Sequence, residues 1–349
     1  MSSTTDVTQI VLPGLVEPEG LQVRTCPRPV PGPGQVLLSM EATGVSFAER
    51  GMRQGKYWQQ PPFPFVPGYD VVGTVTEVGQ NVDPGLAGHR YAAVTKIGGW
   101  SSALLVDVDA LVAVPAGLDV ADAEAVVVNG VTAWQMLHRH ARVRAGGTVL
   151  VLGANSGVGS ILVQLARHAG LRVIGTASAR HLDAVRTLGV EVVDYRADDV
   201  ESQLQALAPG GVDAVFDHVG GPGLARSFRL LARGGTLVSY GVASMPTTTG
   251  NGVGPMISHI ARLAAMSLLP NRRRAVFYDF WAGHKKHPDT FYARLRDDLT
   301  HVFGLLADGT VHAQVAARFP LSQTVQALTL AESRTVLGKV VILPDVFGG

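Results

Sequence analysis

The stretch Val149-Leu150-Val151-Leu152-Gly153-Ala154-Asn155-Ser156-Gly157-Val158-Gly159 has the pattern of a buried strand that runs into a glycine-containing turn and opens a helix. Gly157 and Gly159 allow the backbone to approach a ligand closely, and the N–H groups at a helix N-terminus can hold a pyrophosphate. The literal G-x-G-x-x-G pattern is absent, because Ala154 and Ser156 stand at the first two glycine positions. Taken alone, the turn is also compatible with an ordinary connection from a strand to a helix.

Strands and helices alternate around this turn. We expect strands at 148–153, 172–177, 191–195, 212–217 and 236–240, and helices at 121–140, 157–169, 181–188, 200–207 and 223–232. Parallel strands need crossover connections, so this alternation predicts a doubly wound α/β domain with a parallel sheet between helices. At the head of such a series the turn favours dinucleotide binding, through Ser156, Gly157, Val158 and Gly159.

The first 125 residues have a different pattern. Short apolar runs at 36–40, 71–78, 90–94 and 103–106 alternate with turn signals such as Pro31-Gly32-Pro33-Gly34, which predicts a compact β-rich domain. After 240 the alternation breaks, and we expect helices at 255–268, 289–307 and 322–331 and strands at 311–318 and 338–343. The tail is expected to fold back onto the first domain. The predicted domains are therefore 1–125 with 283–349, and 126–282.

Composition excludes several classes of protein. A length of 349 residues suits two domains, and the net charge of +1 gives no electrostatic attraction to nucleic acid or to an anionic membrane. No apolar run approaches the roughly 18 residues that suggest a membrane span, and the first nine residues lack a secretion signal. Cys26 is the only cysteine, so an intramolecular disulfide is impossible. We expect a soluble, cytoplasmic protein with a small-molecule partner.

The end of the second strand bears on the choice of nicotinamide cofactor. Proteins that bind NAD place an acid there, which contacts the ribose 2′-hydroxyl, but this chain has none. Ser178 can instead hydrogen-bond a 2′-phosphate, Arg180 can pair with it, and Tyr195 can supply a further hydroxyl. The alternative is that Arg180 is a solvated residue of a first helical turn. The pattern predicts NADPH as the cofactor.

Five further motifs follow in order along the chain: Gly44-Val45-Ser46-Phe47, Pro67-Gly68-Tyr69-Asp70, Asn129-Gly130-Val131-Thr132-Ala133, Asp217-His218-Val219-Gly220-Gly221 and Gly338-Lys339-Val340-Val341. Together with the turn at 153–159 they resemble the medium-chain dehydrogenase/reductase superfamily, and within it the quinone oxidoreductase branch, which includes the enoyl reductase domains of polyketide synthases. The resemblance spans the chain apart from about 244–286. It implies a GroES-like catalytic domain and a Rossmann domain, with the active site in the cleft between them, and a homodimer.

The same resemblance bears on zinc. Zinc alcohol dehydrogenases of this superfamily carry a cysteine after the Gly-Val of the first motif and a Gly-His-Glu at the second. Ser46 and Tyr69 occupy these places here, and neither is a usual zinc ligand, so we expect no metal. Without a Lewis acid to stabilise an alkoxide, hydride transfer to a quinone or another activated C=C bond is favoured. In that reaction charge moves onto an oxygen that hydrogen-bond donors can hold.

The resemblance also suggests which residues act on the substrate. Tyr57 occupies the place of an active-site tyrosine, which would orient substrate or donate a proton, or would only line the pocket. Asn129 and Thr132 belong to the segment beside the nicotinamide, and a helix cap is the alternative for Asn129. Ser46, where many relatives have asparagine, and Tyr69, which fills the volume of a zinc ligand, are expected in the substrate pocket.

The remaining candidate residues either follow the ends of predicted strands or are charged. In the resembled family, the backbone at Gly220 and Gly241 approaches the nicotinamide and its ribose. His218 would reach the cofactor or would be a core histidine. The run 272–274 of three arginines would meet a phosphorylated carrier or would simply be solvated. The alternatives for function are an enoyl reductase acting on a thioester or ketone, an NADPH-binding protein with little catalysis, and a zinc alcohol dehydrogenase.

Overall fold

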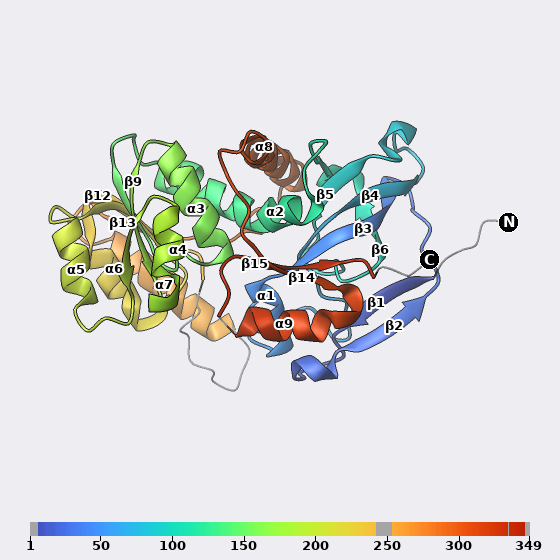
Figure 1. Cartoon of the computed structure of the whole chain (residues 1–349), viewed down its shortest axis with the longest axis horizontal. Coiled ribbons are helices and arrows are strands. Elements are labelled where there is room, and N and C mark those ends of the chain that lie inside the picture. The colour runs from blue at the N-terminus through green and yellow to red at the C-terminus, as the bar shows by residue number, and fades with distance from the viewer. Residues whose placement is uncertain (1–5, 242–252, 334, 346–349) are drawn as a thin grey trace. The chain divides into compact units, whose positions relative to one another are not determined.

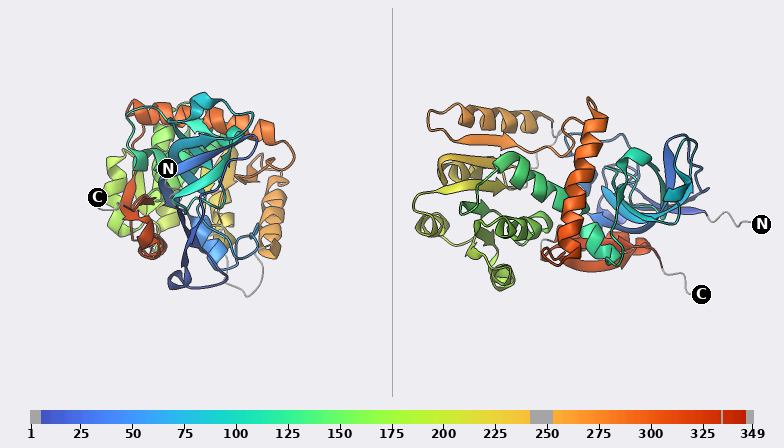
Figure 2. Two further views of the ribbon diagram at one scale, coloured as in Figure 1. Left: turned by 90° about the vertical axis from the view of Figure 1, so that its right-hand side faces the viewer. Right: turned by 90° about the horizontal axis from the view of Figure 1, so that it is seen from above.

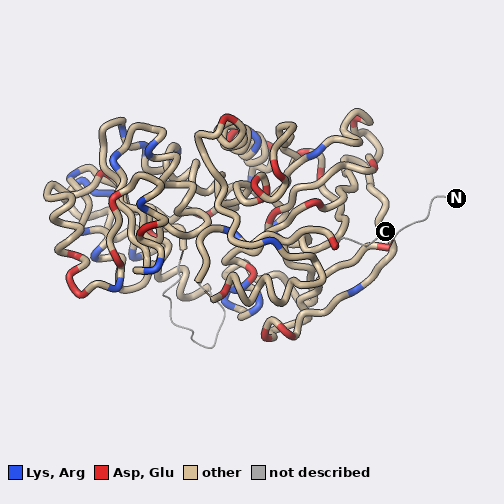
Figure 3. Tube along the Cα trace, in the orientation of Figure 1, with Lys and Arg blue, Asp and Glu red and all other residues tan. Residues whose placement is uncertain are grey.

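The computed structural model describes residues 6–241, 253–333 and 335–345, and its ribbon is drawn in Figure 1. The chain separates into two compact units: unit 1 comprises residues 1–131 and 283–349, and unit 2 comprises residues 132–282. The division falls within helix α2 (Val120–Trp134), which continues into a π-helical segment, Gln135–Ala141. Lys, Arg, Asp and Glu residues are interspersed along both units (Figure 3). Within the described ranges, no helix is long and apolar enough to cross a membrane.

Unit 2 is built on a six-stranded parallel sheet with the order β10-β9-β8-β11-β12-β13. The strands are β8 (Thr148–Val151), β9 (Arg172–Ala177), β10 (Glu191–Asp194), β11 (Val212–Asp217), β12 (Leu231–Ser239) and β13 (Arg274–Phe277). The connecting helices are α3 (Gly157–His168), α4 (Leu182–Thr187), α5 (Val200–Leu207), α6 (Leu224–Arg229) and α7 (Val253–Ser267). The chain steps outward from β8 to β10, returns to β11 beside β8, and then steps the other way. Right-handed crossovers therefore place helices on both faces (Figure 2), which confirms the doubly wound sheet.

Strand β13 is one element that the sequence did not indicate. It has only four residues and begins with a charged one, so it shows neither an apolar run nor a useful alternation. Its place depends on tertiary pairing, since Arg274 to Phe277 align with Thr236 to Ser239 of β12. Ala275 is buried in the core of unit 2. The run of arginines at 272–274 thus enters an edge strand of the sheet.

Unit 1 contains the β-rich domain. Its seven-stranded sheet has the order β14-β15-β3-β4-β5-β7, and β6 also pairs with β3. The strands are β3 (Gln35–Val45), β4 (Asp70–Val78), β5 (Arg90–Val94), β6 (Ala103–Asp107), β7 (Val112–Ala113), β14 (Val315–Pro320) and β15 (Lys339–Leu343), and a separate ribbon joins β1 (Val7–Val11) to β2 (Gln22–Cys26). Because β15 pairs antiparallel with β3, the tail folds onto the first domain, as expected (Figure 1).

Three helices complete unit 1: α1 (Phe47–Arg53), α8 (Pro288–Ala307) and α9 (Thr324–Glu332). Gly130 of α2 lies against α8, where an added Cβ would come within 2.7 Å of a Val302 methyl carbon. This close approach explains the glycine of the Asn129-Gly130-Val131-Thr132-Ala133 motif by helix packing. The core of this unit is formed mainly by alternate residues of the strands, among them Val36, Leu38, Val71 and Val75.

Candidate active site

The turn at the end of β8 has the geometry of a phosphate-binding turn despite its unusual sequence. Ser156 is the N-cap of α3, and its hydroxyl accepts the Gly159 N–H at 3.0 Å. Gly153 takes a left-handed conformation with φ of 67°. A Cβ on Gly159 would lie 2.2 Å from the Gly153 carbonyl oxygen, so only glycine fits there. Ser156 therefore supplies a helix cap where the usual pattern has glycine, and the first N–H groups of α3 have no partner within the helix.

His218 packs directly against this turn. Its Nδ1 lies 3.1 Å from the Leu152 carbonyl oxygen, and a Cβ on Gly153 would come within 2.4 Å of its Cε1. Gly241 lies against the backbone of the same histidine, because its added Cβ would approach the His218 carbonyl oxygen to 2.6 Å. His218 is therefore in close contact with two glycine-bearing loops. A contact with the cofactor stays a prediction.

The motif that starts at Asp217 is explained by one buried carboxylate. Its Oδ1 accepts the N–H groups of Val219 and Gly220 at 2.8 and 2.9 Å, and its Oδ2 accepts the Ser227 hydroxyl at 2.7 Å. Gly220 has φ of 66° in this tight loop. Asp217 therefore shapes the loop that presents Gly220, a role that the sequence analysis missed. The sequence signal for this role was an aspartate at the end of a strand, followed three and four residues later by glycines.

The residues expected at the 2′-phosphate lie together in unit 2. Ser178 follows β9 and Tyr195 follows the adjacent β10, and the Tyr195 N–H donates to the Ala177 carbonyl at 3.1 Å. Ser178 is buried, whereas Arg180 is exposed and Tyr195 is half-exposed. The guanidinium of Arg196, which sequence reasoning missed, lies 5.5 Å from the Tyr195 ring centre. This edge therefore carries two cationic side chains and two hydroxyls.

In unit 1, Ser46 is part of a capping box at the start of α1. Its hydroxyl accepts the Ala48 N–H at 3.2 Å and donates to Glu49, whose Oε2 also accepts the Ser46 N–H at 2.8 Å. Glu49 is almost fully buried, and this burial raises the pKa of its carboxyl from 4.5 to about 7. The capping role accounts for Ser46 without any ligand. Its place in a substrate pocket stays a prediction.

Tyr57 and Tyr69, predicted for catalysis and for the pocket, meet in unit 1. Their hydroxyl oxygens are 3.0 Å apart. Tyr69 is 7% exposed, whereas Tyr57, in the loop after α1, is only partly buried. The ammonium of Lys96 lies 5.8 Å from the Tyr57 ring centre and donates to Gln59 Oε1 at 2.6 Å. Lys96 was not predicted, because nothing in its local sequence places it beside a residue so much earlier in the chain.

Asp70, next to Tyr69, belongs to a buried ion triad. Lys339 Nζ donates to Asp70 Oδ2 at 2.6 Å and to Glu124 Oε1 at 2.7 Å. Burial raises the pKa of the Glu124 carboxyl well above its usual value. Burial alone would lower the pKa of Lys339, but the two carboxylates outweigh it and raise the pKa above the ordinary range. An added Cβ on Gly44 would collide with the Lys339 Cε at 2.1 Å, so three of the sequence motifs meet here.

The triad also fixes α2, because Asp70 Oδ2 accepts the Val128 N–H at 3.2 Å. The next residue, Asn129, lies in the helix interior and donates through Nδ2 to the Ala125 carbonyl at 3.2 Å. The alternative that Asn129 caps a helix is therefore wrong. Asn129 and Thr132 are three residues apart and share one helix face, and both are buried. Their contact with a nicotinamide or substrate stays a prediction.

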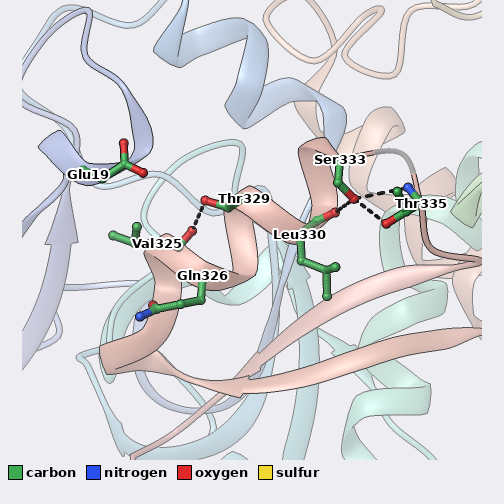
Figure 4. Close-up of a pocket in the computed structure, with 7 residues that line it drawn as sticks. All are labelled: Glu19, Val325, Gln326, Thr329, Leu330, Ser333 and Thr335. Carbon is green, nitrogen blue, oxygen red and sulfur yellow. Dashed lines mark hydrogen bonds between the residues drawn. The ribbon is translucent and has the colours of Figure 1, made fainter.

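Other features of the surface lie outside the predicted site. An open hollow of about 430 Å³ in unit 1 is bordered by α9 (Figure 4), and none of its lining residues belongs to the predicted set: Glu19, Val325, Gln326, Thr329, Leu330, Ser333 and Thr335. Arg273 donates to the Phe228 carbonyl at 3.3 Å, so one of the three adjacent arginines has a structural role. Across residues 6–241, 253–333 and 335–345, no three His, Cys, Asp or Glu side chains gather as a metal-binding group.

Known proteins with related sequences were found for both units. Residues 32–116 match the family model of the alcohol dehydrogenase GroES-like domain, and residues 188–342 match that of the zinc-binding dehydrogenases. The chain is 31% identical over 329 residues to the synaptic vesicle membrane protein VAT-1 homolog of Rattus norvegicus, which covers 93% of this chain and 80% of the relative. A phthioceranic/hydroxyphthioceranic acid synthase of Mycobacterium tuberculosis is 31% identical over 342 residues, which are 96% of this chain and 15% of the synthase.

A solved structure extends the likeness to the whole fold. The quinone oxidoreductase of Thermus thermophilus, which was also solved in complex with NADPH, has a TM-score of 0.77 and 30% identity, over 96% of this chain and 99% of that one. The folds of both units, the order of the sequence motifs and these relatives all indicate the same family. The chain belongs to the medium-chain dehydrogenase/reductase superfamily, in the branch of the quinone oxidoreductases and polyketide enoyl reductases.

Proposed function

We propose that this protein is an NADPH-dependent oxidoreductase that reduces a quinone or another activated C=C bond without zinc. The observation that carries the proposal is the pair of hydroxyls formed by Tyr57 and Tyr69, 3.0 Å apart, because Tyr69 stands where zinc-dependent relatives have a metal ligand. One hydroxyl of the pair donates to the other, and the remaining proton can form a hydrogen bond to a developing oxyanion. Ser46, at the other ligand position, is already used in the capping box with Glu49.

The residues of unit 2 fit the proposed cofactor. The turn of Ser156, Gly157, Val158 and Gly159 would offer helix N–H groups to a pyrophosphate, and the close packing of Gly159 against the Gly153 carbonyl supports a tight turn of this kind. Ser178, Arg180 and Tyr195 would hold the 2′-phosphate, with Arg196 as an added cation. The loops of Gly220 and Gly241 would border the nicotinamide end. When bound, NADPH supplies the hydride for the reaction.

The chain's own residues would handle the charge that the reaction creates. Reduction of a conjugated carbonyl or a quinone moves an electron pair onto oxygen, and hydrogen-bond donors lower the energy of that state. Tyr57 is assigned as the proton donor or orienting group, because a tyrosine hydroxyl, with an ordinary pKa of about 10, carries its proton at neutral pH. Asn129 and Thr132 are assigned to position the nicotinamide and the substrate oxygen. Ser46 and Tyr69 would contribute to the substrate pocket.

An enoyl thioester or ketone is the second candidate acceptor. The 31% identity to the mycobacterial synthase over almost the whole chain supports it. Steady-state oxidation of NADPH, with NADH in parallel, should be measured with an ortho-quinone, a simple enone and a 2-enoyl thioester. Turnover with NADPH preferred supports the proposal, and the best acceptor selects between the candidates. Tight NADPH binding without turnover of any acceptor would favour a binding protein, and stoichiometric zinc in a metal analysis would favour an alcohol dehydrogenase.

We further propose a homodimer that works in the cytoplasm. Val253, Ile257 and Ile260 form an exposed apolar stripe on α7, which packs beside the edge strand β13. An edge strand with an apolar flank can pair with its own copy about a two-fold axis. The single cysteine, Cys26, supports a reducing compartment, because it leaves no intramolecular disulfide to form.

A further inference from the structure

We infer that Tyr69 and Lys96 are positioning residues that make Tyr57 a proton donor to carbon, so that the enzyme completes the reduction of enones as well as quinones. The inference rests on the proposed function. Three observations in unit 1 carry it: the contact between the two hydroxyls, the ammonium beside the Tyr57 ring, and the backbone hydrogen bonds that join Lys96 to Tyr69.

The contact between the hydroxyls leaves one of their protons outside the pair. A hydrogen bond between two phenols uses one of their two protons. Tyr69 is 7% exposed, whereas Tyr57 is only partly buried. When Tyr69 donates to the Tyr57 oxygen, the Tyr57 proton is the one directed outside the pair. After Tyr57 gives that proton away, the Tyr69 hydroxyl already donates to the phenolate, and such charge-assisted bonds are about twice as strong as neutral ones.

Lys96 is held beside the ring by its own backbone. The N–H groups of Thr95 and Lys96 both donate to the Tyr69 carbonyl, at 2.9 and 3.1 Å, and the Thr95 hydroxyl donates to the Gly68 carbonyl at 2.9 Å. Lys96 has φ of 65°, a left-handed conformation that is uncommon for a residue other than glycine. Uncommon backbone conformations persist where surrounding contacts hold them, and they cluster at functional sites. Here the conformation keeps a cation within 5.8 Å of the ring that would become negative.

The chemistry of the acceptors makes the arrangement testable. When bound, NADPH would supply a hydride to the β-carbon of an enone, and the electron pair of the C=C bond would form an enolate. The α-carbon must then form a C–H bond with the proton released from the Tyr57 oxygen, and water later returns a proton to the phenolate. Reduction of an ortho-quinone needs no proton on carbon. The negative charge ends on the oxygen atoms, which take protons from water directly. Protonation of carbon by Tyr57, supported by Tyr69 and Lys96, is therefore a step that enone reduction needs and quinone reduction does not.

The experiment compares kcat and KM for a simple enone and an ortho-quinone at saturating NADPH. Tyr69→Phe and Lys96→Met should each lower kcat for the enone by roughly 10-fold, less than the about 100-fold expected for losing the acid itself in Tyr57→Phe. In Lys96→Met the KM values, and kcat for the quinone, should stay within about twofold, and Lys96→Arg should restore most of the enone kcat because it returns the cation. Lys56→Met is the matched control, since the Lys56 ammonium donates to Gln54 instead.

Each other outcome overturns the inference. Equal losses with both acceptors in Lys96→Met would mean that Lys96 only supports the fold of the loop. An unchanged enone kcat in both variants would remove their role, and so would a wild-type enzyme that reduces the quinone but not the enone. Failure of the wild-type protein to oxidise NADPH with any acceptor would refute the proposed function itself, before any variant is compared.

Discussion

Replacing Lys339 by methionine should destabilise unit 1 strongly, because its ammonium lies between two buried carboxyls. Lys339 is 4% exposed, and Asp70 and Glu124 are completely buried. The substitution removes hydrogen bonds of 2.6 and 2.7 Å to these carboxyls and leaves Asp70 with the 3.2 Å bond from the Val128 N–H. Two hydrogen bonds to charged groups contribute about 3–6 kcal/mol, and breaking a buried ion pair from one side costs about 3–5 kcal/mol.

The free energy of unfolding should therefore fall by about 3–5 kcal/mol, and the melting temperature of unit 1 by about 10 °C or more. Scanning calorimetry and urea unfolding of the full chain measure both quantities. Lys286→Met, at an exposed position of the same unit, is the matched control and should shift stability by less than about 0.5 kcal/mol. NADPH affinity reports whether unit 2 remains intact. A loss below about 1 kcal/mol for Lys339→Met would refute this account of the triad.

Three further predictions concern other parts of the chain. Burial raises the pKa of Glu49 from 4.5 to about 7, so the folded state binds the proton more tightly than the unfolded one, and stability should fall by about 3 kcal/mol as pH rises from 4.5 to above 7. Glu49→Gln should flatten that part of the profile of unfolding free energy against pH, and an unchanged profile would contradict the assignment. Arg180→Ala should raise KM for NADPH by about 10-fold to 100-fold and leave KM for NADH unchanged, as expected for one bond to a charged phosphate. Arg186→Ala, at an arginine paired with Asp183, is its control, and an unaltered cofactor preference would eliminate Arg180 from the site. Ile257→Glu should convert the proposed dimer into a monomer in light scattering, whereas Leu15→Glu, at a residue of similar exposure in unit 1, should not. A dimer that survives Ile257→Glu would place the interface elsewhere.

The sequence predicted best what depends on local pattern. The alternation of apolar strands with helices indicated five of the strands of unit 2, because a parallel sheet buried on both faces is apolar along each strand. It missed β13, whose four residues become a strand only by pairing with β12. It also missed α1 and the ribbon of β1 and β2, whose Gln22–Cys26 strand is mostly exposed and lacks an apolar face. The secondary structure of such elements is determined by tertiary contacts, which a short stretch of sequence does not reveal.

The candidate site likewise contains residues that the local sequence pattern predicts and residues that only the fold brings together. Ser178 and Tyr195 lie at one edge of the sheet because the adjacent parallel strands β9 and β10 end there, and their contact with a 2′-phosphate stays a prediction. Lys96, Glu124 and Arg196 were missed, since each acquires its role from partners brought together by the fold: Lys96 from Tyr57, Glu124 from Lys339 and Arg196 from the ring of Tyr195. A lone charged residue in sequence usually indicates a solvated surface, so only the fold can show that it faces a ring or a buried carboxyl.

The second motif sets two residues with different contacts side by side. Asp70 begins β4 and Tyr69 directly precedes it, and successive side chains of an extended chain point to opposite sides. Tyr69 contacts Tyr57, whereas Asp70 contacts Lys339 and the backbone of α2. Position 69 is therefore available to change the chemistry, while position 70 anchors β15 and α2 whatever the chemistry is. It follows that Tyr69→Phe should leave the melting temperature of unit 1 nearly unchanged, whereas Asp70→Asn should lower it, because the amide leaves the Lys339 ammonium with one charged partner fewer in a buried site.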